Sequence, residues 1–549
     1  QANQNEMHGG QSVPNFDYAM AEGVRKTFRK SYYKALAQYF EATHGMARED
    51  ARLLAEAVKR SVPEEPVMEH GESLGEALAR WLPAHQAENG FEPIPEQDAR
   101  CAHDYAMRTA WSDTNDATYQ AMEALIHNLN TMNSRAGAQV PFSSINYGTD
   151  TSPEARMAIR NLLLATDAGL GDGETPIFPV QIFKVKEGVN FNPGDPNYDL
   201  FRLAIKTSAK RLFPNFSFLD APFNLQYYKP GDYNTEVAYM GCRTRVMGNV
   251  YDPDREVTCG RGNLSFTSIN LPRIAIEAKG DLNAFFRMLD DRMDLVVRQL
   301  LHRFQIQCGK KVYNYPFLMG QGVWIDSDKL GPDESVEEVL RHGTLSVGFI
   351  GLAETLKALT GKHHGESEES QKLGLKIIGH MRDRMDEESR KRRLNFTLLA
   401  TPAEGLSGRF LRMDQKKYGK LPGITDRDYY TNSFHVPVYY PISAFKKIEL
   451  EAPYHALTNA GHISYVELDG DVCRNLDAFE SVVRWMKQCG VGYGSVNHPV
   501  DRDPVCGYTG VIGDVCPRCG RREGEGVSVE KLRELRKKFP SMPQFVGLE

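Results

Sequence analysis

Three groups of residues in this chain have types and spacings that could carry out chemistry. The first is a single cysteine, Cys242, in the segment YMGCRTR at 239–245, followed by Asn263 in GRGN at 260–263. A lone cysteine is usually a small buried hydrophobic residue. Here the neighbouring glycine and arginine, together with the later asparagine, favour a second interpretation: a thiol in a loop between strands, where the folded core excludes water.

The second group is the segment Thr401-Pro402-Ala403-Glu404. Thr401 suits a helix N-cap, Pro402 suits the first helical position, and Glu404 can close a capping box. These features are sufficient to start a helix and need no further role. A helix that begins after a buried strand also presents free N–H groups and the positive end of its dipole to a phosphate. Both readings stay open at this point.

The third group is a set of cysteines near the C-terminus, Cys506, Cys516 and Cys519, the last two in the knuckle CPRCG. A Cys-x2-Cys turn places two thiolates on one tetrahedral ion, so the pattern predicts a structural zinc ribbon. A ribbon normally has two such pairs, and Asp503 stands where the missing cysteine would be. The fourth ligand is therefore Asp503, His498 or a distant residue.

Composition excludes several classes of protein. The 549 residues are 41% hydrophobic and 25% charged, which suits a globular protein and not a disordered, collagen-like or coiled-coil chain. With 66 basic and 72 acidic residues the net charge is −6, which gives no case for a nucleic-acid partner. No apolar run is long enough for a membrane span, and residues 1–14 lack a signal-peptide core. Nine scattered or clustered cysteines predict a reducing, cytoplasmic location.

The first predicted element is a helix from Gly23 to Thr43. Its apolar face recurs every four residues and comprises Val24, Phe28, Tyr32, Leu36 and Phe40. A basic run covers much of the remaining surface: Arg25, Lys26, Arg29, Lys30 and Lys34. Such a run is either a solvated face or a surface that contacts a nucleotide phosphate or another subunit.

Strands and helices alternate through the rest of the chain. Residues 60–100 are rich in Pro, Glu and Gly and are expected to be irregular or briefly helical, and residues 101–130 are helical in pattern. Strands are predicted at 139–147, 177–185, 264–271, 344–350 and 394–400. Helices are predicted to start at the capping segment 151–154, to span 281–303, and to run through 352–359. This alternation predicts a parallel α/β architecture with helices outside.

Five stretches carry a resemblance to a known family: 127–150, 240–246, 260–278, 394–410 and 506–521. Together they resemble the catalytic subunit of the anaerobic, class III ribonucleoside-triphosphate reductases, which are glycyl-radical enzymes. The resemblance implies a ten-stranded α/β barrel with a central finger loop near 242, outer helices and a small C-terminal zinc ribbon, in a homodimer. It divides the chain into a helical dimer and effector region (1–100), a barrel core (101–490) and a zinc-ribbon region (491–549).

The resemblance also implies roles for individual residues. Cys242 carries the thiyl radical that removes the 3′-hydrogen, and Asn263 is the polar partner near the substrate hydroxyls. Met240 is a feature of members that use formate as reductant. Glu404 exchanges protons during loss of the 2′-hydroxyl. The substrate-binding residues implied are Thr401, Pro402 and Ala403 for the phosphates, with Ser143 and Ser144 lining the pocket.

The function expected is reduction of ribonucleoside triphosphates to their 2′-deoxy forms, with dNTP and ATP effectors and a radical-SAM activating enzyme as partners. The alternative is a catalytically inactive, nucleotide-binding zinc protein of the same fold. A glycyl-radical lyase of the acyl-transferring type is disfavoured because the chain has no adjacent cysteine pair. The family's Arg-x-x-Gly-Tyr radical segment and its ATP-cone are not found in these residues, so the natural chain is expected to be longer.

Overall fold

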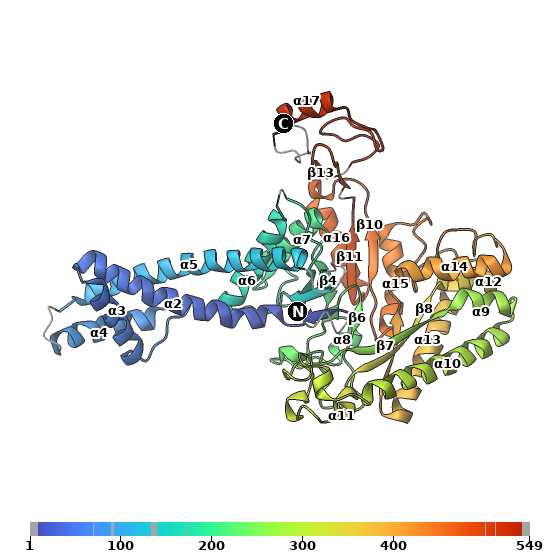
Figure 1. Ribbon diagram of the computed structural model, residues 1–549, viewed down its shortest axis with the longest axis horizontal. Coiled ribbons are helices and arrows are strands. Elements are labelled where there is room, and N and C mark those ends of the chain that lie inside the picture. Colours follow the sequence, from blue (N-terminus) through green and yellow to red (C-terminus); the bar gives the residue numbers. More distant parts are fainter. Residues whose placement is uncertain are drawn as a thin grey trace.

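In the computed structural model the chain is a mixed α/β protein with an N-terminal helical lobe, two main sheets and a small C-terminal unit (Figure 1). The structure describes residues 9–69, 71–88, 93–132, 140–171, 173–499, 501–510 and 512–540. Within these ranges no helix has both the length and the apolar composition that a bilayer crossing requires.

Four long helices form the N-terminal lobe, which extends to the left in Figure 1: α2 (Phe16–His44), α3 (Arg48–Ser61), α4 (Glu72–Glu88) and α5 (Glu96–Thr131). The predicted apolar face of α2 is confirmed, because all five of its residues are buried. The helix begins at Phe16 and not near Gly23, since its first turn is also buried. There Asp17 Oδ2 accepts three backbone N–H groups, from Gly148, Thr149 and Asp150, at 2.8–3.1 Å.

The expectation for residues 60–100 was wrong. Most of the segment is helical: α4 has 17 residues and contains Pro83, and α5 starts at Glu96. Leu74, Leu78 and Leu82 recur at helical spacing and are buried. Burial of this leucine face outweighs the weak local preference of the Pro and Gly residues for loops.

The first sheet contains six strands in the order β1-β2-β3-β4-β11-β10. Their bounds are β1 (Gln11–Val13), β2 (Ser143–Tyr147), β3 (Val180–Val185), β4 (Asn215–Phe218), β10 (Ser464–Glu467) and β11 (Tyr493–Asn497). Neighbours are parallel except β4 and β11, which are antiparallel. The helices that connect or cover these strands are α6 (Pro153–Ala168), α7 (Tyr198–Arg211), α15 (Ala444–Leu457) and α16 (Leu476–Gln488). The N-cap of α6 is Ser152 rather than Thr151.

The second sheet has three parallel strands in the order β7-β8-β9. They are β7 (Asn263–Asn270), β8 (Thr344–Ile350) and β9 (Asn395–Ala400). The helices around them are α9 (Leu271–Ala278), α10 (Leu282–Cys308), α12 (Leu352–Thr360), α13 (Glu368–Arg392) and α14 (Glu404–Tyr418). Each sheet has its own large apolar core. The predicted strands are therefore confirmed with small shifts of their ends, although Gln139 lies outside the described residues.

The two sheets meet at Gly461, just before β10. Gly461 bridges Leu399 of β9 in parallel fashion and Thr244 in antiparallel fashion, and Ala400 N donates to Gly461 O at 3.1 Å. Its φ of +135° lies in a region that favours glycine, and a Cβ here would lie 2.0 Å from Arg243 O. Only glycine fits at this junction.

The α/β class of the prediction is confirmed, whereas the closed ten-stranded ring is not observed. Among the described residues the strands are hydrogen-bonded into separate sheets. The remaining regular elements of the described residues are two short strands of a hairpin described below, two short helices, α8 (Pro222–Leu225) and α11 (Glu337–Leu340), four single-turn 3-10 helices, and the C-terminal elements. The latter are β12 (Asp501–Arg502), β13 (Thr509–Gly510) and α17 (Val529–Lys538), which stand apart from the body at the top of Figure 1.

Candidate active site and metal centre

Cys242 lies at the turn of a short hairpin between the two sheets. The arms are β5 (Tyr239–Met240) and β6 (Thr244–Arg245), paired antiparallel with Tyr239 opposite Arg245. Gly241 has a φ of +56°, and a Cβ on it would lie 2.5 Å from the ring of Phe142. The glycine beside the cysteine thus allows both the turn and the close approach. The loop interpretation of Cys242 is confirmed in its geometry.

The first sheet holds one arm of this hairpin through side chains of β2. Asn146 Nδ2 donates to Tyr239 O, and Tyr239 N donates to Asn146 Oδ1, each at 2.9 Å. Gly241 N donates to Ser144 Oγ at 3.0 Å. One asparagine side chain thus satisfies both backbone groups of Tyr239, as a neighbouring strand would.

Ser143 and Ser144 do not share a role, because adjacent side chains of a strand point to opposite faces. Ser144 contacts the hairpin, whereas the buried hydroxyl of Ser143 has no hydrogen-bond partner among the described residues. Both were expected to line a substrate pocket. The structure assigns Ser144 a part in positioning Gly241.

The other arm is attached to the second sheet and to the junction. Arg243 Nη1 donates to Ala400 O and to Thr401 O, both at 3.2 Å. His462 N donates to Arg243 O at 3.1 Å, and Arg245 N donates to Ala460 O at 2.8 Å. Cys242 therefore sits between the first sheet and the C-terminal end of β9.

The environment of Cys242 keeps its thiol protonated. Burial raises the pKa of Cys242, an effect that the adjacent Arg243 opposes and the negative charge of Glu404 reinforces. Glu404 is the first residue of α14, so the structure brings this predicted carboxylate within electrostatic range of the predicted radical cysteine. At neutral pH the side chain keeps its S–H bond, which is the form that can exchange a hydrogen atom.

The capping box predicted at Thr401 is not formed. The α14 helix begins at Glu404, with Ala403 in the N-cap position and no side-chain cap. Thr401 is buried and its hydroxyl is hydrogen-bonded to Ser268 Oγ at 2.8 Å. This pairing consumes the hydroxyl that a cap would use. Ala403 N donates instead to the side chain of Asn432 at 2.9 Å.

Asn263 and Met240 occupy different positions around the hairpin. Asn263 opens β7, and its amide donates to Thr344 Oγ1 at 3.0 Å and to Ser346 Oγ on the adjacent strand β8. Met240 is half-buried on β5, where it pairs with Thr244. The site also contains residues that the sequence analysis did not single out, including Asn146. The only sequence signal for Asn146 was a polar residue between Ile145 and Tyr147 in the predicted strand, and it did not indicate the partner Tyr239.

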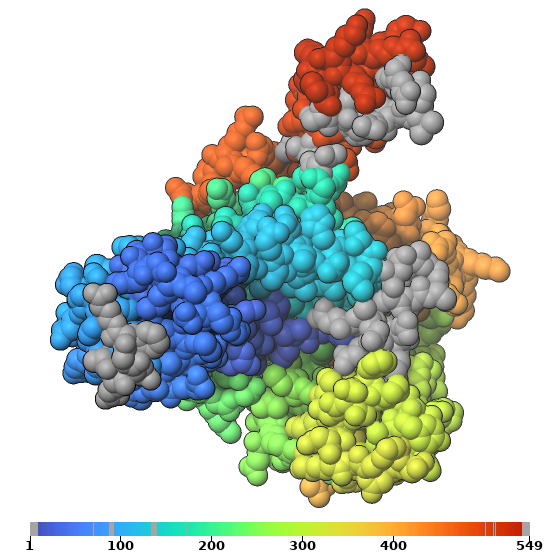
Figure 2. Space-filling view, turned by 60° about the vertical axis from the view of Figure 1, so that its left-hand side comes forward, coloured from blue at the N-terminus to red at the C-terminus, as the bar shows by residue number. Residues whose placement is uncertain are grey.

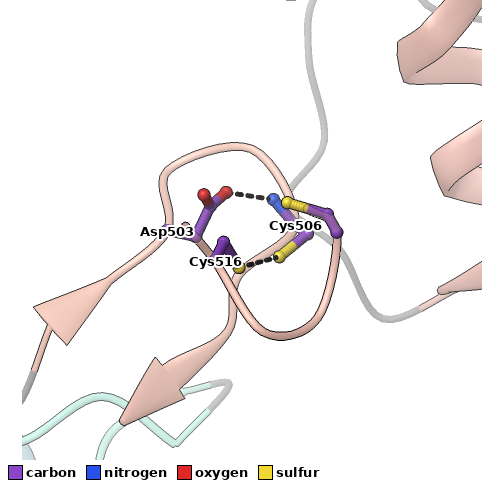
Figure 3. Close-up of side chains that lie close together, drawn as sticks. Asp503, Cys506 and Cys516 are labelled. Atoms are coloured by element: carbon purple, nitrogen blue, oxygen red, sulfur yellow. Dashed lines mark hydrogen bonds between the residues drawn. The ribbon is translucent and has the colours of Figure 1, made fainter. Parts of the chain in front are cut away.

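The C-terminal unit gathers the predicted metal ligands. Four potential ligand atoms lie within 4.8 Å of one another, one each from Asp503, Cys506, Cys516 and Cys519. Figure 3 shows three of these side chains converging. Cys506 Sγ and Cys516 Sγ are 3.7 Å apart. A tetrahedral ion with zinc–sulfur bonds of about 2.3 Å separates two thiolates by about 3.8 Å, so the residues fit zinc.

Asp503 takes the place of the missing cysteine. Its Oδ1 accepts N–H groups from Val505 at 2.8 Å and Cys506 at 2.9 Å, and Arg521 Nε donates to Oδ2 at 3.0 Å. These hydrogen bonds form a tight turn that brings the side chains of Asp503 and Cys506 close together. His498, the other nearby option, lies against Ser208 O at 3.3 Å and is not in the described cluster.

A family model described as anaerobic ribonucleoside-triphosphate reductase matches residues 1–532. The chain belongs to this family. It is 36% identical over 431 residues to the reductase of Salmonella typhimurium, covering 77% of this chain and 59% of that protein. It is 35% identical over 430 residues to the reductase of enterobacteria phage T4, covering 76% of this chain and 68% of that protein. The chain thus spans about three fifths of the length of the Salmonella relative.

Solved structures of anaerobic ribonucleotide reductases share the fold. One superposes with a TM-score of 0.54 at 15% identity, covering 95% of this chain and 86% of that chain. The Thermotoga maritima enzyme in complex with dATP and CTP gives a TM-score of 0.53 at 16% identity, covering 94% and 90%. At this level of identity the likeness concerns the fold alone.

We expect Asn146→Ala to loosen the hairpin of this reductase-family chain. The change removes both hydrogen bonds to Tyr239 and leaves its buried N–H unpaired, whereas Tyr239 O still accepts from Ser12 Oγ; the expected cost is about 1–3 kcal/mol. Amide hydrogen exchange over 239–245 should accelerate by about tenfold or more if local opening carries the cost. Ser143→Ala is the matched control, because that buried hydroxyl makes no hydrogen bond to the described part of the chain. Equal protection in both variants would contradict the assigned role of Asn146.

Proposed function

We propose that this chain forms the catalytic part of an anaerobic ribonucleoside-triphosphate reductase. The observation that supports this most is a protonated cysteine at the tip of a hairpin held by both sheets, with Glu404 in electrostatic range. The net reaction converts a ribonucleoside triphosphate, formate and a proton to the 2′-deoxyribonucleoside triphosphate, carbon dioxide and water. Loss of radical chemistry in this chain is disfavoured because Cys242, Asn263 and Glu404 are all present in their family contexts.

In this mechanism Cys242 removes and later returns the 3′-hydrogen of the substrate. A glycyl radical, installed by a radical-SAM partner, supplies the unpaired electron. A thiol suits the exchange because its S–H bond is weak enough to be formed and broken reversibly. Glu404 accepts and donates protons while the 2′-hydroxyl leaves as water, Asn263 contacts the ribose hydroxyls, and Met240 lies two residues from the radical sulfur.

The substrate triphosphate binds at the start of α14. This helix has 15 residues and follows β9 directly after the turn Thr401-Pro402-Ala403. Its first N–H groups and positive dipole end favour an anion there. Arg243, the residue next to Cys242, donates from Nη1 to Thr401 O in the same turn. A nucleotide with its phosphates on α14 therefore extends its ribose toward the thiol.

We infer that the strands belong to a ten-stranded barrel. Nine strands follow one another as β1-β2-β3-β4-β11-β10 and, across the Gly461 junction, β9-β8-β7. One further strand between the outer edges of β1 and β7 would complete ten. The hairpin of Cys242 then corresponds to the central finger. The C-terminal zinc unit is a separate structural support, and the free thiols of the chain suit a reducing cytoplasm.

The N-terminal lobe is proposed to form the homodimer contact and to bind a dNTP or ATP effector. A cavity of about 970 Å³ lies between α2 and α3, within the lobe shown in blue in Figure 2. Eight lysines and arginines but only three glutamates line it, and Tyr33 adds an aromatic surface. Such a lining suits a phosphate with an attached base. We propose that the loop 8–11 also contributes to the dimer contact and the effector site. Its first residue, His8, lies outside the described residues.

Replacing Arg29 and Lys30 together by Ala should weaken dTTP binding by about tenfold or more, because each charge-assisted contact contributes about 1.5–3 kcal/mol. Isothermal titration calorimetry on the full-length dimer measures this. Lys206→Ala, an exposed lysine on α7, serves as the control and should bind dTTP as the wild type does. Unchanged binding in the double variant would show that the basic run is only a solvated face.

Cys242→Ser should abolish turnover and spare the fold. Serine is nearly isosteric, but its O–H bond is too strong for hydrogen exchange, and loss of one sulfur should cost on the order of 1 kcal/mol of stability. The full-length protein is activated anaerobically with its radical-generating partner, and the glycyl radical and deoxynucleotide are measured by EPR and product assay. A retained radical without product is expected. Substantial product from the serine variant would refute the assignment, and Cys308→Ser is the control that should retain turnover.

The protein should contain about one zinc per chain, bound by three thiolates and Asp503. Cys516→Ser should reduce the zinc content to well under half an equivalent, while Cys473→Ser, an exposed thiol outside the cluster, should not change it. Metal analysis of reducing, zinc-replete preparations measures both. A wild-type content below half an equivalent would argue against the site.

A further inference from the structure

Buried arginines in this chain fall into two kinds. Four arginines are at least nine-tenths buried, and none of them forms an ion pair with a described carboxylate: Arg211, Arg243, Arg245 and Arg261. In three of them the Nε group donates to an oxygen at 2.8–3.0 Å, contributed by Asp167, Asn224 and His342 respectively. Arg243, beside Cys242, is the exception: its Nε is buried and has no hydrogen-bond partner among the described residues.

A second buried polar group, the ring of His435, lies close to this guanidinium; with its Nδ1–H facing Glu451, its Nε2 is an acceptor. His435 is 6% exposed, its Nε2 has no partner within the described chain, and its Nδ1 lies 3.2 Å from Glu451 Oε2. The ring of Tyr465 on β10 lies between the two groups, 5.9 Å from the Arg243 guanidinium carbon and 5.9 Å from the His435 ring. Arg243 follows Cys242 in the chain, and Tyr465 lies within electrostatic range of the Cys242 thiol, so these two polar side chains lie beside it.

Unpaired buried donors of this kind are costly unless a ligand satisfies them. A ligand that accepts from the Arg243 guanidinium cation is favoured when its own charge is negative. The field of Arg243 lowers the pKa of Tyr465 against the larger raising effect of burial, which places the phenol beside the same cation. A planar carboxylate can accept from a guanidinium edge and from a further donor at once.

We propose that Arg243, with Tyr465, forms the binding site for the carboxylate of formate, the reductant of the proposed reaction. This inference rests on the proposed function. Formate bound here lies next to the sulfur of Cys242, whereas the phosphates on α14 lie on the other side of Arg243, where Nη1 meets the 401–403 turn. Arg243 thus separates two anion sites, with Nη1 facing the turn and Nε left for the small carboxylate.

The same donor could instead receive a substrate phosphate, and the experiment separates the two anions. Binding of formate to the unactivated full-length protein is followed by broadening of the formate proton resonance, and binding of CTP by calorimetry. Arg243→Gln should weaken formate binding by about tenfold or more, equivalent to about 1.4 kcal/mol or more, with CTP affinity changed less than about threefold. A tenfold loss of CTP affinity with formate binding unchanged would overturn the proposal.

A matched control lies two residues away. Arg245 is equally buried, but its donors go to Asn224, Phe223 and Asn459, so Arg245→Lys should leave formate binding intact. If Arg243→Gln fails to fold, Tyr465→Phe is measured in its place, and unchanged formate affinity in that variant would overturn the proposal. In the activated enzyme, Arg243→Lys should raise the formate KM by about tenfold while the nucleotide KM stays near that of wild type.

Failure of the proposed function gives a different result. A wild-type enzyme that makes deoxynucleotide only with a dithiol, and releases no labelled carbon dioxide from labelled formate, would remove formate as the reductant. The binding measurements on unactivated protein decide the anion site separately. A wild-type protein that does not broaden the formate resonance at all would overturn the inference, whatever its activity.

Discussion

The position of Cys242 depends on how a very short hairpin satisfies its buried backbone. Each arm has only two paired residues, and an isolated pair of strands this short has little stability of its own. Buried N–H and C=O groups must nevertheless find partners. They find them in the surrounding sheets, through Asn146 on one side and the Gly461 junction on the other. Cys242 is therefore held in place by the two sheets together.

Two charged side chains next to Cys242 have opposite effects on the pKa of its thiol. Arg243 and Glu404 act in opposite directions on the pKa of Cys242, while burial sets the overall direction. A thiolate would be a poor hydrogen-atom donor and would react with other electrophiles, so a neutral thiol suits radical exchange. The arrangement keeps a cation next to the sulfur without ionising it, which leaves that cation available for an anionic ligand.

Much of this site could be predicted from sequence, and the exceptions have physical reasons. The strands at 344–350 and 394–400 were recognisable because buried parallel strands are continuous apolar runs, and the clustered cysteines indicated their own geometry. The role of Asn146 could not be predicted, since its partner Tyr239 is 93 residues away. The capping pattern at 401–404 was misleading because Ser268, from another strand, takes the hydroxyl of Thr401. In α4, tertiary burial of leucines overrode the local composition.

Strand β1 links the N-terminal lobe to the hairpin that contains Cys242. Ser12 Oγ donates to Tyr239 O at 3.0 Å, and α2 begins only four residues later in the chain. At the same end Asp17 is fixed to the 148–150 backbone. The 29-residue α2 helix thus begins close to the residue that contacts the Tyr239 arm of the Cys242 hairpin, Ser12 of β1. The N-terminal lobe and the first sheet thus share one acceptor, Tyr239 O, on the arm that leads to Cys242.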